Sequence, residues 1–313
     1  YGQVGDDGGY QRNLSQRFIY QSQWGYGGKS RLGTTGETAE ESPYTWYNEL
    51  SVANPEIHWE IAKKINVGAD FGLFKGFVSG TFDWYREDRT DVLLPGGQRA
   101  IPPYFGATAP IANLGQVENR GYEVELKFNH TFGNGMNVWW TTNFTHSKNK
   151  IITADDPELY PAYQKREGYA VNQAHSYVSQ GYYNTWDELY ASTIHSTNDA
   201  AKLPGNYNIL DYNADGIIDA KDNVPYGYTG TPQNTYNNTV GFNWKGLSAF
   251  VQFYGVNNVT RQVVLTSLGS QNHVVYDQGS YWSKDDTGAD LPMPRWLATA
   301  SDFNNGSRFM YDG

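Results

Sequence analysis

The clearest periodic signal in the chain is a two-residue alternation of apolar and polar side chains between residues 121 and 132. The apolar set is Tyr122, Val124, Leu126 and Phe128, and the polar set is Glu123, Glu125, Lys127 and Asn129. Successive side chains of a β-strand point to opposite faces of a sheet, whereas a helix would distribute both sets around its axis. The segment is therefore predicted to be a strand with one apolar face and one polar face.

The same alternation flanks three short turns, which predicts three β-hairpins of one design. The turns lie at residues 74–76, 133–135 and 245–246. The apolar positions of the flanking strands are Ile65, Val67, Ala69, Phe71, Val78, Phe82, Trp84, Val138, Trp140, Phe144, Val240, Phe242, Trp244, Leu247, Ala249, Val251 and Phe253.

The connections between these hairpins are long. More than thirty residues separate Trp84 from the strand at Gly121, and about ninety separate His146 from the strand at Thr239. Compact soluble domains rarely contain such loops, whereas outer-membrane barrels combine short periplasmic turns with long extracellular loops. We therefore predict an all-β chain whose antiparallel strands form part of a large transmembrane β-barrel, with residues 148–236 as a long extracellular loop.

Composition agrees with this prediction and excludes a helical membrane protein. Only 39% of the chain is hydrophobic, and no stretch approaches the roughly 20 consecutive apolar residues of a membrane-spanning helix. A barrel strand meets the bilayer with every second residue, so a low average hydrophobicity does not argue against it. The aromatic content of 16% suits the girdles of a barrel, but it also suits a large soluble β protein or a carbohydrate-binding sandwich.

Charge and residue types exclude several other functions. The net charge of -10 leaves no basic stripe for nucleic acid, and the absence of cysteine removes disulfides and thiolate zinc sites. No histidine pair has the helical spacing of a metal site, and no Gly-x-Ser-x-Gly motif occurs, so we predict that the chain is not an enzyme. Glu123 and Glu125 point the same way, and we interpret them as a polar row facing a watery lumen rather than as a catalytic pair.

Residues 211–222 match the spacing of a calcium-binding loop, with oxygen ligands at positions one, three, five, nine and twelve and glycine at six. The predicted ligands are Asp211, Asn213, Asp215, the backbone carbonyl of Ile217, Asp219 and Asp222. Position twelve is aspartate rather than glutamate, and this shorter side chain makes bidentate coordination harder. Bound calcium would be structural; the alternative is a turn held by its own backbone hydrogen bonds without a metal.

Three aromatic residues of the long loop, Tyr182, Tyr183 and Trp186, are candidate substrate contacts. Sugars present apolar C–H faces that stack on aromatic rings. The alternative is that these rings pack the loop against its neighbours or against a partner protein. Trp140 lies within a predicted strand, and we interpret it as part of an aromatic girdle.

Four motifs, taken in order, give the chain a resemblance to a known family. They are Asn54-Pro55-Glu56-Ile57-His58-Trp59-Glu60, Gly115-Gln116-Val117-Glu118-Asn119-Arg120-Gly121-Tyr122-Glu123, Arg166-Glu167-Gly168-Tyr169, and Leu203-Pro204-Gly205 ahead of the calcium-type loop. Their order and spacing resemble the C-terminal half of SusC/RagA-like TonB-dependent outer-membrane transporters of Bacteroidetes. The opening segment, Tyr1 to Gly5, also fits this family.

This resemblance implies a barrel of about 22 strands in the Gram-negative outer membrane, closed by an N-terminal plug. Residues 1–313 would be part of that barrel, with the signal peptide, the plug, the TonB-contacting segment and the last strands outside the chain. The implied activity is import of oligosaccharides or peptides, driven through TonB, with a SusD-like surface lipoprotein as a lid. Two other functions stay open, a soluble calcium-dependent glycan-binding β protein and a surface adhesin.

Overall fold

The structure is a computed structural model that describes residues 1–7, 18–29, 45–102, 104, 108–197, 199–262, 280–289, 293 and 310–312. It divides into two compact units, and each is described by itself. The sheet unit comprises Tyr1–Pro161, Lys165–Tyr169 and Gly241–Ala249. The loop unit comprises Ala162–Gln164, Ala170–Val240 and Phe250–Gly313. Among the described residues, no helix is both long enough and apolar enough to cross a membrane.

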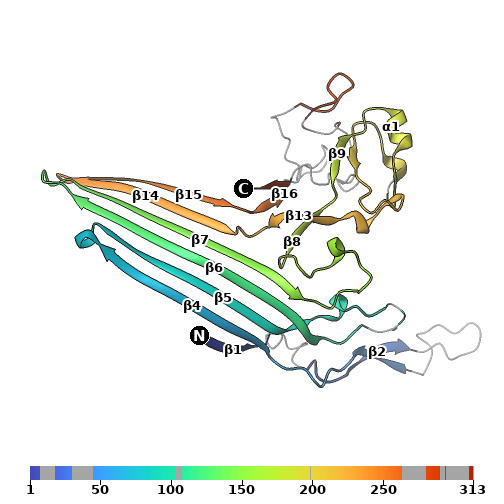
Figure 1. Cartoon of the computed structure of the whole chain (residues 1–313). Helices are drawn as coiled ribbons and strands as arrows, with labels where there is room; N and C mark the ends of the chain where they lie inside the picture. Colours follow the sequence, from blue (N-terminus) through green and yellow to red (C-terminus); the bar gives the residue numbers. More distant parts are fainter. Residues whose placement is uncertain are drawn as a thin grey trace, which may run out of the picture. The chain divides into compact units, whose positions relative to one another are not determined.

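The main sheet contains seven strands in the order β1-β4-β5-β6-β7-β14-β15, and its long strands run side by side in Figure 1. The pairings of β1 with β4, β4 with β5, β5 with β6, and β6 with β7 are antiparallel. This confirms the all-β, antiparallel prediction, and the described sheet is an open segment rather than a closed barrel. The bounds are β1 Gly2–Asp6, β4 Glu60–Leu73, β5 Val78–Leu94, β6 Ala112–Thr131, β7 Asn137–Thr153, β14 Asn234–Trp244 and β15 Leu247–Asn257.

Short turns join β4 to β5, β6 to β7, and β14 to β15, as the alternation predicted. In the last of these, Lys245 and Gly246 both have positive φ, at 48° and 83°. Positive φ at both central residues defines a type I′ turn, whose twist matches that of the flanking strands. Glycine adopts this conformation without steric cost, so Gly246 is the residue that the turn requires.

The strands extend beyond the predicted segments at the ends away from the short turns. β5 continues past Trp84 to Leu94, β6 begins before Gly121 at Ala112, and β7 continues past His146 to Thr153. These extensions carry charged side chains on both faces, as in the run from Arg86 to Arg89, so the apolar alternation stops while backbone pairing continues. The connection between β7 and β14 therefore covers residues 154–233.

This connection contains most of the loop unit's secondary structure. The core of the loop unit is built from Tyr182, Tyr207, Ile209, Ile218, Trp282 and Ala289, with Tyr177 and Met293 packed against it. The elements of the connection are β8 Gln173–Ser176, β9 Ser179–Tyr182, α1 Trp186–Ala191, β10 Ile194–His195, β11 Tyr207–Ile209, β12 Ile217–Ile218 and β13 Val224–Thr229. Two further pairs are β2 Gln23–Lys29 with β3 Thr45–Ser51 in the sheet unit, and β16 Thr260–Gln262 with β17 Met310–Asp312 in the loop unit.

Candidate functional site

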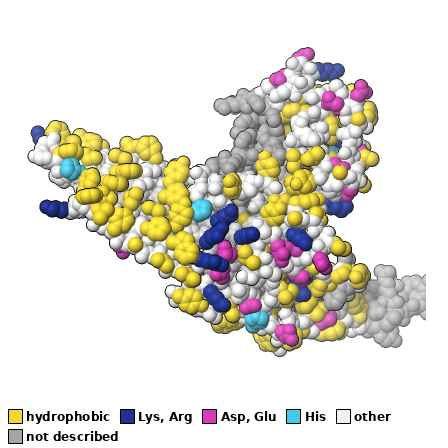
Figure 2. All heavy atoms as spheres, in the orientation of Figure 1, with side chains coloured by type: hydrophobic (Ala, Val, Ile, Leu, Met, Phe, Trp, Pro, Cys, Tyr) yellow, Lys and Arg dark blue, Asp and Glu magenta, His cyan; other side chains and the backbone are white. Residues whose placement is uncertain are grey.

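One face of the sheet, called the apolar face, presents large apolar side chains to the surroundings. The register aligns them across strands: Phe82 lies opposite Ala69 and Val124, and Trp84 lies opposite Val67 and Tyr122. Phe82 is 42% exposed and Val67 is 60% exposed, whereas rings packed inside a sandwich would be buried. Figure 2 shows hydrophobic side chains as a broad yellow field over the long strands. The exposure argues against a soluble sandwich, since exposed apolar areas of this kind mark contact with a membrane or a partner.

Aromatic rings bound the apolar face at both ends. Trp84, Tyr122 and His146 share a row at the end towards the long loops, and Tyr122 stacks on Phe144 at 5.8 Å. From Tyr122 to Phe132 the strand covers about 34 Å at roughly 3.4 Å per residue. A tilt of about 40° reduces this length to about 26 Å, which matches the apolar band of an outer-membrane barrel, about 25 Å tall.

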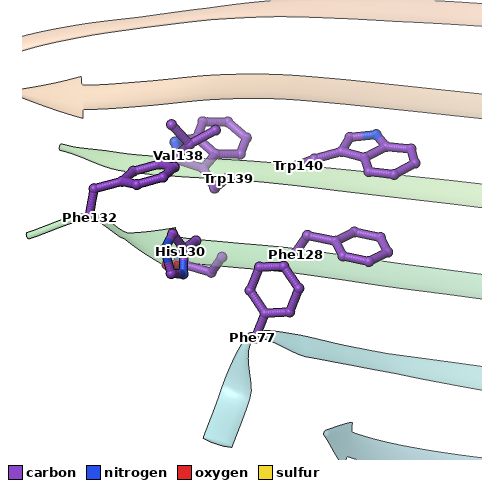
Figure 3. Close-up of a pocket in the computed structure, with 8 residues that line it drawn as sticks. Phe77, Phe128, His130, Phe132, Val138, Trp139 and Trp140 are labelled. Carbon is purple, nitrogen blue, oxygen red and sulfur yellow. The ribbon is translucent and has the colours of Figure 1, made fainter. Parts of the chain in front are cut away.

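At the short-turn end, aromatic rings line a shallow apolar hollow of about 430 Å³ (Figure 3). The rings of Phe128 and Trp140 stack there, with centroids 4.9 Å apart and planes 12° apart. Phe77 meets His130 edge to face. The complete lining is Phe77, Phe128, Asn129, His130, Phe132, Val138, Trp139 and Trp140. These rings have the arrangement of an interfacial aromatic girdle.

The opposite face, called the polar face, carries charged and hydroxyl side chains at the alternate positions. Glu123 lies opposite Asp83 and Thr145, and Glu125 forms an ion pair with Lys127. Glu123 and Glu125 therefore share this face, as the alternation predicted. Polar side chains on the concave side of a wide barrel face its watery interior.

A network of ion pairs joins three strands on the polar face near the long loops. The Arg89 guanidinium lies 3.1 Å from Asp6, 3.3 Å from Glu60 and 3.2 Å from Glu87. Glu60 is only 4% exposed, and it also accepts a hydrogen bond of 2.9 Å from the backbone N–H of Leu93. Because a buried carboxylate needs such partners, the glutamate of the first resemblance motif has a structural role in holding β1, β4 and β5 together.

The third resemblance motif forms a clamp in the loop after β7. The Arg166 guanidinium contacts Asp156 at 2.8 Å and the backbone oxygen of Gln98 at 2.6 Å. The backbone N–H groups of Arg166 and Glu167 also donate to the Asp156 carboxylate. Burial alone would raise the pKa of Asp156, but these hydrogen bonds outweigh it and hold the pKa below its ordinary value. Asp156 therefore stays ionised and anchors the loop.

The predicted aromatic contacts separate into two groups. Tyr182 and Tyr183 are buried, at 8% and 1% exposure, and Tyr182 packs on Tyr207 with ring centroids 5.3 Å apart. Because both rings are enclosed, they pack the loop against its neighbours and leave no ring face open to a sugar. Trp186 is 50% exposed and stacks on Tyr190, which is 78% exposed, so α1 presents two adjacent rings to solvent. Tyr190 was not selected from the sequence. Its pairing with Trp186 follows only from the helix, which places residues i and i+4 side by side.

The calcium-type loop is closed by the residue at its twelfth position. Asp222 is fully buried, and its carboxylate accepts hydrogen bonds from the backbone N–H groups of Tyr212 at 2.8 Å and Asp219 at 2.8 Å. Gly216 has φ of +88° and donates its N–H to Asp211 at 2.9 Å. The predicted turn therefore forms. Backbone N–H groups already donate hydrogen bonds to some of its carboxylate oxygens, namely those of Asp222 and one oxygen of Asp211.

The remaining oxygens of this loop provide the test of whether a cation fits. Asp211 Oδ1 is buried and has no hydrogen-bond partner among the described residues, so it has a lone pair to offer. The Lys221 ammonium lies 3.1 Å from Asp215 and 3.6 Å from Asp219, and it acts as their counter-ion. Within the described residues, no three acidic or histidine side chains converge as a ready-made metal cluster. The donor types suit a hard cation such as calcium, provided that Lys221 moves away.

A second buried polar cluster lies near α1 in the loop unit. The Lys202 ammonium contacts Asp199 at 2.7 Å and Ser192 at 3.0 Å, although Lys202 is only 8% exposed. His195 Nε2 is buried and has no hydrogen-bond partner among the described residues. Burial and the positive charge of Lys202 lower the pKa of His195, against the opposing effect of Asp199. His195 is therefore kept neutral.

Comparisons with known proteins agree with this geometry. No protein-family model matches the chain. TonB-dependent receptor P3 of Formosa agariphila is 28% identical over 279 residues, which cover 83% of this chain and 26% of that protein. TonB-dependent receptor P39 of the same organism is 27% identical over 198 residues, covering 60% of this chain and 19% of that protein. The chain thus spans about a quarter or less of the length of these relatives.

Solved structures show the same fold. The RagAB peptide transporter aligns with a TM-score of 0.62 at 16% identity, covering 99% of this chain and 31% of that one. The RagAB peptide importer in its closed-closed state aligns with a TM-score of 0.60 at 17% identity, covering 99% and 32%. The fold is similar to that of a segment of the RagA β-barrel. The resemblance to SusC/RagA-like TonB-dependent transporters, first indicated by the motifs, is confirmed.

Proposed function

We propose that this chain forms part of the barrel of an outer-membrane importer that takes up oligosaccharides or peptides and depends on TonB. The observation that carries the proposal is the apolar face of β4–β7, about 26 Å tall, bounded by aromatic rings and backed by a polar face. A soluble glycan-binding protein would not leave an apolar band of this size exposed to water. The similarity to TonB-dependent receptors and to a peptide importer supports the class of transport, and it leaves both substrate classes in the proposal.

The proposal includes two protein partners. A SusD-like surface lipoprotein would cover the barrel on the side of the long loops, and TonB would act from the periplasmic side. The loop unit offers α1 for contact with either the lid or the substrate, because Trp186 and Tyr190 keep their rings exposed. Nucleic acid and catalysis have no place in the proposal.

Uptake in the native host tests this function. Deletion of the gene is expected to abolish accumulation of labelled oligosaccharides or of labelled peptides, and deletion of TonB should have the same effect. Restoring the full-length protein with Trp186→Ala should reduce uptake, whereas Asp187→Asn, an exposed neighbour on α1, should not. If the deletion strain keeps its uptake but loses attachment to a surface, the protein is an adhesin.

We further propose that residues 211–222 bind calcium and that the ion stabilises the loop unit. The ligands would be Asp211, Asn213, Asp215, the Ile217 carbonyl, Asp219 and Asp222. The unpartnered Oδ1 of Asp211 and the acidic side chains gathered around the glycine turn support this assignment. Lys221 would compete with the ion for Asp215 and Asp219, which predicts an affinity at the weak end of such loops, about 10⁻⁴ to 10⁻³ M.

Terbium binding to the full-length protein tests the calcium site, since Tyr212 within the loop can sensitise terbium emission. Emission should appear with terbium, decrease when calcium is added, and be lost in Asp211→Asn. Lys221→Met should strengthen calcium binding several-fold, because it removes the competing ammonium. Lys245→Met, in the β14–β15 turn of the sheet unit, is the matched control. Equal emission from wild type and Asp211→Asn would remove calcium from the proposal and leave the metal-free turn.

A further inference from the structure

Cationic side chains follow directly after the aromatic row on the apolar face. Arg86 lies opposite Arg120, and Arg120 lies opposite Lys148, so three adjacent strands contribute a row with no acid in it. The next row along the strands contains Lys63, Asp88, Glu118 and Lys150, which oppose one another in that order. We call the five cations of these two rows the basic girdle: Lys63, Arg86, Arg120, Lys148 and Lys150.

The carboxylates within these rows do not neutralise the basic girdle. Arg86 pairs with Asp88 at 2.9 Å and with Glu118 at 2.7 Å, and Arg120 lies 3.9 Å from Glu118. Five cations face two carboxylates, which leaves three positive charges on a chain whose net charge is -10. Within the described part of the chain, the three lysines form no ion pair, and all five cations are exposed. Like charges at this spacing repel one another, so an anion bound among them would be stabilised.

The position of the basic girdle defines which anion can reach it. Arg86 and Arg120 are each two residues beyond the aromatic row of Trp84 and Tyr122, about 7 Å along the strand. Aromatic rows mark the boundary between hydrocarbon and headgroups, so the basic girdle lies at headgroup depth on the long-loop side. Figure 2 shows Lys and Arg side chains gathered directly beside the apolar field. This step rests on the proposed barrel function.

We infer that the basic girdle binds the phosphate groups of anionic lipid in the outer leaflet. The guanidinium of Arg120 can present two parallel N–H donors to phosphate oxygens, and the lysines act as mobile point charges around the same group. Such a contact fixes the depth of the barrel in the membrane on the side where substrate enters. At the short-turn end the outward strand positions include His130, Phe132 and Val138. The cations Lys75 and Lys245 lie there singly in two separate turns, so the described residues form no row of cations across adjacent strands at that end.

Lipid binding to the full-length receptor in a neutral detergent tests the inference. The probes are lipid A with its phosphates and the same lipid after enzymatic dephosphorylation, and retained lipid is counted by native mass spectrometry. The triple variant Arg120→Gln, Lys148→Gln, Lys150→Gln should retain phosphorylated lipid A at least about tenfold more weakly than wild type. The matched control, Lys75→Gln, Lys245→Gln, Lys284→Gln, removes three exposed lysines elsewhere and should bind like wild type.

The outcomes separate this inference from the proposed function. Equal retention by wild type and triple variant, or equal retention of both lipids, overturns the basic girdle as a phosphate site while the barrel stands. Competition by free inorganic phosphate with no preference for lipid would likewise overturn the assignment to membrane lipid. A protein that stays soluble without detergent would instead overturn the barrel itself. Retention that weakens steeply with added salt supports the electrostatic contact.

Discussion

At the scale of single residues, a few glycines decide which side chains the polar face can hold. Gly121 lies beneath the ring of Tyr85, and a Cβ placed there would come within 2.2 Å of the carbonyl oxygen of His146 and 2.5 Å of the Tyr85 hydroxyl. Gly121, the second glycine of the second resemblance motif, is therefore required because the Tyr85 ring of the neighbouring strand packs closely on it. Gly241 is in the same position under Trp139, where a Cβ would meet the ring at 2.4 Å.

We predict that Gly121→Ala destabilises the barrel by about 1–3 kcal/mol, because the backbone oxygen cannot move away from the added methyl group. The control is Gly72→Ala on the same face, where a Cβ would have no atom within 4 Å. Denaturant unfolding of the full-length protein in lipid vesicles measures both changes. Equal midpoints for the two variants would contradict the packing argument.

At the scale of elements, each strand of the sheet has two environments that alternate along it. Leu126 lies on the apolar face, opposite Gly80 and Thr142, while its neighbour Glu125 lies on the polar face. In the proposed barrel, the same backbone would therefore meet lipid on one side and water on the other. A charge on one face has a different cost from the same charge on the other.

We predict that Leu126→Arg costs about 2–4 kcal/mol of folding free energy, as expected for a cation near the middle of the bilayer. Thr145→Arg, on the polar face opposite Glu123, adds the same charge and should cost little. The folded fraction after refolding into phosphatidylcholine vesicles, read from heat-dependent gel mobility, compares the two. A similar loss in both variants would mean that the apolar face does not meet lipid.

At the scale of the whole chain, the sheet unit and the loop unit have different sources of stability. The loop unit has its own core around Tyr207 and Trp282, and it contains the half-buried His195, whose pKa is lowered by burial and by the positive charge of Lys202. A histidine whose pKa is lowered in the folded state stabilises the fold above its unfolded pKa of about 6.5, and this contribution is lost as the pH falls below that value. The loop unit should therefore loosen in mild acid.

We predict that hydrogen exchange of residues 170–233 accelerates several-fold between about pH 7 and pH 5.5, after correction for intrinsic rates. His195→Gln should flatten this pH dependence, whatever its effect on overall stability. His175→Gln, at an exposed histidine of the same unit, should keep the wild-type slope. Asp199 has a lowered pKa and would titrate well below this range, so it does not account for the change. An unchanged slope in His195→Gln would assign the effect to another group.

The sequence by itself determined the two faces of the sheet and the three short turns. Alternation is a local property: Tyr122 and Glu123 must point to opposite sides of any strand that contains them. It also determined the turn around Gly216, because the glycine and its acidic neighbours lie close together in the chain. The motifs from Asn54 to Gly205 were sufficient for the family resemblance, since their order and spacing can be read from the sequence without the fold.

Only the tertiary structure decided which distant residues meet. Strand register brings Arg86, Arg120 and Lys148 into one row, although they are far apart in the sequence. Packing buried Tyr182 and left Trp186 exposed, and no local pattern distinguishes these two rings. The reason is physical: the side of a strand is set by its own backbone, whereas pairing, burial and charge clustering depend on residues contributed by other segments.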